Sequence, residues 1–177
     1  MSTKDFLKKI KDEDIEYVDV RFTDTRGKLQ HVTIVSDLVD EDFVEEGFMF
    51  DGSSIAGWKS IEASDMKLML DTDTAYVDPF YAEKTICVHC SVVEPDTGEA
   101  YERDPRGTAQ KAEAYLKASG IGDVAYMGPE AEFFLFDNVK FSNSINKVSY
   151  EVDASDASWN TDTDYEMGNM GHRPGLK

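Results

Sequence analysis

The stretch that decides the fold is Gly128–Phe136, with the sequence GPEAEFFLF. Its last four residues are large and apolar, and three of them are aromatic. This composition predicts a strand buried on both faces that begins after the Gly-Pro turn. Because side chains alternate along a strand, Glu130 and Glu132 should project from the same face, while Ala131 points the other way.

Two carboxylates at that separation, beside a buried run, are costly unless a positive charge lies between them. A divalent cation supplies that charge, and carboxylate oxygens suit Mg²⁺ or Mn²⁺. Glu130 and Glu132 are therefore candidate metal ligands. The alternative is that they mark the solvent-exposed end of a half-exposed strand. The pattern is short, so both interpretations stay open on the residues alone.

The composition is that of a folded globular protein. The chain has 177 residues, of which 41% are hydrophobic and 11% aromatic, enough for one core or for one small domain and part of another. Its 36 acidic and 18 basic residues give a net charge of −18, which disfavours nucleic acid and anionic membranes as partners. No segment resembles a signal peptide or a membrane span.

The two cysteines, Cys87 and Cys90, lie three residues apart in a segment of strand composition. At that spacing their side chains point to opposite faces, so they cannot easily share a disulfide or a metal. A redox pair would be expected at a helix N-terminus instead. The pair indicates two buried thiols in a reducing cytoplasm.

The first hundred residues predict a short helix over residues 3–12, which Thr3 can cap, followed by strands. A hairpin turns at Asp24–Gly27, and a short acidic helix over Ser36–Glu46 stops at Gly47. The predicted strands share alternating apolar residues and are separated by turns at 71–74 and 78–79; they cover Val18–Phe22, Leu29–Val35, Met66–Leu70, Ala75–Val77 and Thr85–Val93.

The stretch Met49–Trp58, MFDGSSIAGW, combines turn-forming residues with two large aromatics. Two interpretations compete. The aromatic residues could anchor a turn to the local core, or the stretch could be a binding loop that presents Asp51 and Trp58.

From residue 104 onward the chain predicts a second domain. Asp104 can cap a helix that starts at Pro105, carries an apolar stripe and ends at Gly120. After Phe136 a hairpin over 141–152 is expected, and residues 153–175 are acidic and then glycine-rich. A helix and one or two strands cannot bury the face of Phe133–Phe136, so we expect the second domain to be incomplete in this chain.

Taken in order, several motifs resemble the N-terminal part of a bacterial type I glutamine synthetase. They are RFTD at 21–24, DGSSIAGW at 51–58, DPR at 104–106, GPEAEFFLF at 128–136 and GHRPG at 171–175. The resemblance covers essentially the whole chain. It implies an α+β fold, with an N-terminal β-grasp domain over residues 1–100 and, over 104–177, the beginning of a catalytic domain with a curved antiparallel sheet.

The resemblance also implies an activity. The family makes glutamine from L-glutamate, ammonium and ATP through γ-glutamyl phosphate, with two divalent metals, Mg²⁺ or Mn²⁺. By resemblance, Glu130 and Glu132 each supply a ligand to one of two neighbouring metal sites. Asp51 binds ammonium and takes its proton, and Ser54 and Trp58 help to shape a site shared with the adjacent subunit. The implied assembly is a homo-oligomer of two stacked hexameric rings in the cytoplasm.

Type I enzymes are more than twice this length, so the remaining metal ligands and the ATP and glutamate contacts would lie beyond Lys177. We therefore expect no turnover from these 177 residues alone. Two alternatives remain open: a sibling ligase that couples glutamate to a larger amine, and a non-catalytic, glutamine-synthetase-like assembly protein.

Overall fold

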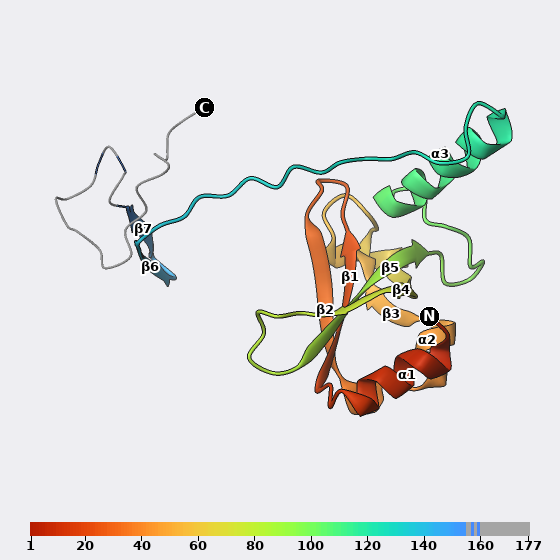
Figure 1. Ribbon diagram of the computed structural model, residues 1–177, viewed down its shortest axis with the longest axis horizontal. Coiled ribbons are helices and arrows are strands. Elements are labelled where there is room, and N and C mark those ends of the chain that lie inside the picture. The colour runs from red at the N-terminus through yellow and green to blue at the C-terminus, as the bar shows by residue number, and fades with distance from the viewer. Residues whose placement is uncertain (155–156, 158, 160–177) are drawn as a thin grey trace. The chain divides into compact units, whose positions relative to one another are not determined.

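The computed structural model describes residues 1–154, 157 and 159 (Figure 1). It divides into two compact units, Met1–Ala125 and Tyr126–Lys177. Among the described residues, no helix is long and apolar enough to cross a membrane. The domain boundary near residue 100 stays a prediction; in the structure, the helix that follows residue 104 belongs to the first unit.

A five-stranded sheet forms the centre of the first unit, with the strand order β2-β1-β5-β4-β3 (Figure 1). Strands β1 and β5 run parallel, and the other neighbours run antiparallel. The strands are β1 (Tyr17–Thr23), β2 (Leu29–Val35), β3 (Phe48–Asp51), β4 (Asp65–Val77) and β5 (Thr85–Val93). The helices are α1 (Thr3–Asp12), α2 (Glu41–Glu46) and α3 (Pro105–Ser119), with 3-10 turns η1 (Ser36–Leu38), η2 (Gly52–Ser54) and η3 (Ile61–Ala63).

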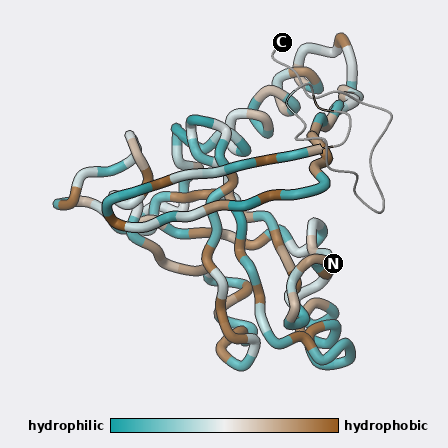
Figure 2. The backbone as a smooth tube through the Cα atoms, turned by 90° about the vertical axis from the view of Figure 1, so that its left-hand side faces the viewer, coloured by the Kyte–Doolittle hydropathy of each residue, from teal (hydrophilic) through white to brown (hydrophobic). Residues whose placement is uncertain are grey.

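The two faces of this sheet differ in chemistry because side chains alternate along each strand. Along the backbone, hydrophilic and hydrophobic residues follow one another at short intervals (Figure 2). On the apolar face, Val18 pairs with Ile86, and Val20 with Val88. Phe6 and Ile10 of α1 belong to the same buried cluster. The opposite face carries polar groups, among them Asp19 and Arg21 of β1, which form a salt bridge.

Several local predictions are confirmed. The hairpin of β1 and β2 pairs Tyr17 with Val35 and Thr23 with Leu29. The helix over residues 3–12 is present, although its cap is Ser2 rather than Thr3: the Ser2 side chain accepts a hydrogen bond from the Asp5 N–H at 3.1 Å. Cys87 and Cys90 are both free and buried. Cys87 pairs with Asp19 on the polar face and Cys90 with Leu70 on the apolar face.

Two predictions about the middle of the chain are wrong. The helix over Ser36–Glu46 is split into η1 and α2, because Asp40 caps α2 by accepting a hydrogen bond from the Phe43 N–H at 2.8 Å. The apolar Leu38, in η1, is 69% exposed. The predicted turn at 71–74 lies within the continuous strand β4, where the pairing with β5 shifts register between Asp71 and Tyr76.

Helix α3 begins and ends as predicted. The Asp104 side chain accepts a hydrogen bond from the Arg106 N–H at 3.0 Å, and Gly120 ends the helix in the left-handed region with φ of 71°. Asp104 also accepts a hydrogen bond from the Val92 N–H of β5 at 3.0 Å, which ties the start of α3 to the sheet. The apolar stripe is not buried among the described residues, since Gly107 is the buried position on this helix.

The second unit contains a hairpin of β6 (Asn138–Ser144) and β7 (Lys147–Asp153), which confirms the hairpin predicted over 141–152. The strand predicted at Phe133–Phe136 is wrong for this structure: Phe133 is 76% exposed, and no strand is assigned there. A strand needs a neighbour to complete its backbone hydrogen bonds. Within the described part of this unit, β6 and β7 pair only with each other.

Candidate functional site

The first group of candidate residues lies where β3 ends. Asp51 is the last residue of β3 and pairs with Asp65 of β4. Its Oδ1 accepts hydrogen bonds from the Ser53 hydroxyl at 2.6 Å and from the Ser53 N–H at 2.8 Å. These bonds from Ser53 hold the pKa of Asp51 below its usual value. Asp51 and Ser54 are both exposed, so the loop presents an anionic carboxylate to solvent at neutral pH.

Gly52 allows the loop to leave the sheet at this point. Its N–H donates a hydrogen bond to the Ser64 carbonyl at 2.7 Å. A Cβ at this position would lie 2.5 Å from Cγ of Met66 and 3.0 Å from that same carbonyl oxygen. Only a glycine fits this close approach, and the position of the neighbouring Asp51 depends on it.

The far end of the loop is anchored in the core. Trp58 is 5% exposed, and its ring centroid lies 5.5 Å from that of Phe22 and 5.2 Å from that of Tyr101. The Tyr101 hydroxyl donates a hydrogen bond to the Trp58 carbonyl at 2.9 Å. The structure therefore combines the two interpretations of this loop: its aromatic end anchors the turn, and its acidic end is exposed. The Trp58 side chain is buried in the core rather than presented by the loop, and its role beside a shared site stays a prediction.

A buried polar network on the opposite face of the sheet was missed by the sequence reasoning. Asp19 of β1 is fully buried. Its carboxylate accepts hydrogen bonds from Arg21 Nε at 2.6 Å and from the Thr33 hydroxyl at 2.7 Å, and it lies 2.7 Å from His31 Nδ1. Burial alone raises the pKa of Asp19, but the hydrogen bonds from Arg21, His31 and Thr33 outweigh it and leave this pKa below its usual value.

Arg21 extends the network to the end of β4. Its guanidinium donates to Asp78 Oδ2 at 3.0 Å and to the Tyr76 hydroxyl at 2.7 Å. Cys87 lies beside these groups, and burial raises its pKa to about 11. The thiol therefore stays protonated at neutral pH and is a poor nucleophile. The arrangement is suited to holding β1, β2 and β4 together rather than to chemistry.

The candidate metal ligands lie in the second unit. Glu130 and Glu132 are both exposed in a stretch without assigned secondary structure. Just downstream, the rings of Phe134 and Phe136 stack with centroids 6.2 Å apart and an interplanar angle of 24°. Residues two apart thus share a side of the chain there, as the alternation predicts for the two glutamates.

Two carboxylates offer oxygen donors of the kind that Mg²⁺ and Mn²⁺ prefer, but they are only part of an octahedral shell. Within the residues that the structure describes, no group of three or more His, Cys, Asp or Glu side chains is placed to hold a metal. The donor chemistry fits a divalent metal, and further ligands are needed to complete the site. The GHRPG motif at 171–175 lies outside the described residues.

Comparison with known proteins gives the family. Residues 14–95 match the model described as glutamine synthetase, beta-Grasp domain, and residues 102–173 match the model described as glutamine synthetase, catalytic domain. The sequence is 73% identical over 173 residues to a glutamine synthetase of Cereibacter sphaeroides and 69% identical over 176 residues to one of Rhodobacter capsulatus. These alignments cover 98% and 99% of this chain, but only 37% and 40% of the relatives.

Among solved structures, the cryo-EM structure of Plasmodium falciparum glutamine synthetase is similar to this chain, with a TM-score of 0.67. The sequences are 23% identical, and the match covers 89% of this chain and 30% of that chain. At this identity the likeness concerns the fold alone. The α+β prediction with an N-terminal β-grasp domain is confirmed. The chain belongs to the glutamine synthetase family.

Proposed function

We propose that this chain is part of an ATP-dependent glutamate–ammonia ligase that makes glutamine through γ-glutamyl phosphate. One observation supports it above the others: the two glutamine synthetase family models match in order, and the catalytic-domain match over 102–173 includes Glu130 and Glu132. Cytoplasmic L-glutamate, ammonium and ATP are the proposed substrates, with two divalent metals, Mg²⁺ or Mn²⁺, per complete site.

In this proposal Glu130 and Glu132 hold the metals from one side of an extended segment. Bound metals neutralise charge on the phosphoryl group, and phosphoryl transfer depends mainly on such neutralisation and on positioning. Asp51 attracts the ammonium cation and accepts a proton from it. The hydrogen bonds from Ser53 support the attraction of the cation, because they keep the Asp51 carboxylate ionised and fix its orientation.

The proposed assembly is a homo-oligomer of two stacked hexameric rings. In it the loop of Asp51 and Ser54 faces the metal-binding segment of the adjacent subunit. The exposure of Asp51 and Ser54 supports this arrangement, since a residue must be accessible on its own subunit to reach a neighbour. Trp58 fixes the loop from within the core.

The activity can be tested with the full-length protein and Mn²⁺ or Mg²⁺. We expect γ-glutamyl transfer to hydroxylamine, and ATP-dependent glutamine synthesis from glutamate and ammonium. A preference for polyamines over ammonium would instead favour the sibling ligase. Absence of both activities in a folded, metal-loaded oligomer would favour the non-catalytic assembly protein.

The role of Asp51 can be tested by Asp51→Asn. We expect ammonium-dependent kcat/KM to fall by about a hundredfold, because the variant loses both the anion and the proton acceptor. Asp96→Asn, which removes an exposed carboxylate from another turn, should leave kcat/KM unchanged.

The sharing of the site between subunits can be tested by refolding Asp51→Asn subunits together with Glu132→Gln subunits. If the loop and the metal segment meet across a subunit interface, random mixing should restore about a quarter of the wild-type activity, since a site then needs one intact part from each neighbour. If both parts belong to one subunit, every site carries a lesion and the mixture stays inactive.

A further inference from the structure

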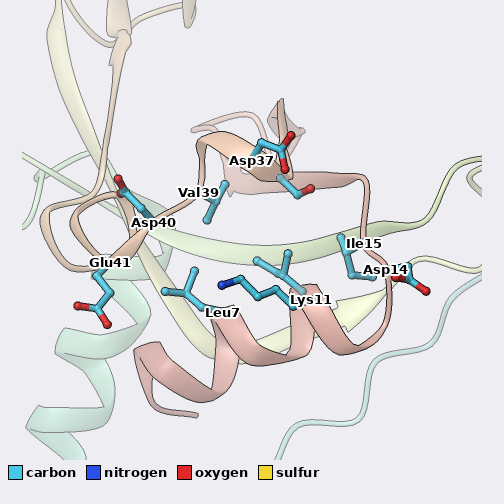
Figure 3. Close-up of a pocket in the computed structure, with 10 residues that line it drawn as sticks. Leu7, Lys11, Asp14, Ile15, Asp37, Val39, Asp40 and Glu41 are labelled. Carbon is cyan, nitrogen blue, oxygen red and sulfur yellow. The ribbon is translucent and has the colours of Figure 1, made fainter.

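An open groove of about 650 Å³ runs between α1 and the segment that contains η1 and the start of α2 (Figure 3). Its apolar part is formed by Leu7 and by three nearly buried residues, Ile10, Ile15 and Val39. The groove lies on the first unit, and neither Asp51 nor Glu130 contributes to its lining.

The rim of the groove is acidic. It carries the carboxylates of Asp14, Asp37, Asp40 and Glu41, against a single lysine, Lys11. Asp40 caps α2. Within the described part of the chain, none of the four carboxylates forms a salt bridge. The rim thus adds local negative charge to a chain whose net charge is already −18.

Lys11 lies in the groove itself, between the α1 wall and the wall that carries Asp37 and Val39 (Figure 3). Lys11 is exposed, so its ammonium group remains in contact with water. No described group of three or more acidic side chains is placed to hold a metal, so the negative charge suits several spread-out cations better than one divalent ion. Anionic ligands are disfavoured by repulsion.

From this charge pattern and apolar floor, we propose that the groove docks a basic amphipathic helix of a partner protein. Leucine-type side chains of that helix would lie on Ile10, Ile15 and Val39, and its lysine or arginine side chains would face the acidic rim. Laying an apolar helix face into a groove is a common mode of peptide recognition. The charged rim would mainly set the association rate and the choice of partner.

The test uses full-length protein and a fluorescently labelled synthetic helix with leucines at i, i+3, i+4 and i+7 and lysines elsewhere. We expect saturable binding by fluorescence anisotropy that weakens with salt, and much weaker binding of the same peptide with glutamate in place of lysine. Absence of saturable binding, or equal binding of the glutamate peptide, would overturn the proposal.

Protein variants locate the binding. The double variant Asp14→Asn with Asp37→Asn should raise Kd about three- to tenfold, the effect expected for two exposed ion pairs. Asparagine tolerates the positive φ of 51° at position 14. The matched control, Asp96→Asn with Glu99→Gln, removes the same charge from an exposed turn elsewhere. If both double variants weakened peptide binding equally, the effect would be one of overall charge, and binding in the groove would be contradicted.

A variant that is expected to strengthen peptide binding completes the test. Lys11→Ala removes the cation that lies in the groove and should tighten peptide binding about threefold. The control is Lys4→Ala, which makes the same change in net charge at an exposed position on the same helix. Equal tightening by the two variants would contradict the proposal. Circular dichroism should show unchanged folding for all of them.

Discussion

Replacing Glu132 by glutamine in the full-length protein is expected to lower glutamine synthesis by about a hundred- to a thousandfold. The substitution keeps the shape of the side chain but removes the anionic oxygen that would bind a metal. Metal-assisted charge neutralisation contributes several kcal/mol to such reactions, and each 1.36 kcal/mol corresponds to about a factor of ten in rate. Glu130→Gln should have a comparable effect, since the proposal assigns one glutamate to each of two metals.

Two measurements are needed to interpret this result. Activity gives the rate, and titration of the apo protein with Mn²⁺ gives the metal affinity, which should fall as well. Glu99→Gln is the matched control, because Glu99 is an exposed glutamate on a turn of the first unit. If Glu132→Gln left both Mn²⁺ affinity and activity at wild-type values, the ligase proposal would lose its metal site, and the non-catalytic assembly protein would be favoured.

The second large effect concerns stability. Asp19→Asn should lower the free energy of unfolding by about 3 kcal/mol at pH 7, within the range for breaking a buried charge pair. Asp19 is fully buried and accepts hydrogen bonds from Arg21 and Thr33. An amide cannot accept all of these bonds as an anion does, and its NH₂ group would face other donors. Urea unfolding followed by circular dichroism measures the change, with the exposed Asp65→Asn as control.

The pH dependence of this difference follows from the pKa of Asp19. Because that pKa is lower in the folded protein than in the unfolded chain, the stabilisation is complete above the unfolded value, near pH 4. It is lost as the pH falls through the folded pKa. The difference in free energy of unfolding between the wild type and Asp19→Asn should therefore become smaller as the pH falls. If this difference in free energy stayed constant from pH 7 to below pH 3, a stabilising role for the ionised carboxylate would be contradicted.

Local patterns in the sequence determined much of the first unit. Alternating apolar residues predicted β1, β2 and β5, and the Asp104-Pro105 start with Gly120 at the end predicted α3. The spacing of Cys87 and Cys90 placed the two thiols on opposite faces. These features depend on periodicity, capping and turn residues, which act over a few neighbouring positions. The ordered motifs also predicted the family, which the comparisons confirmed.

Tertiary structure alone decided the features that depend on distant partners. Asp19 alternates with Val18 and Val20 like a solvent-facing residue, yet it is buried, because Arg21, His31 and Thr33 converge on it across two strands. Trp58 lies in a glycine-rich loop, yet it is buried because the rings of Phe22 and Tyr101 pack against it. Phe133–Phe136 has the composition of a buried strand, but no strand is assigned there. A local pattern specifies which face a side chain takes, whereas burial and strand pairing depend on residues far away in the chain.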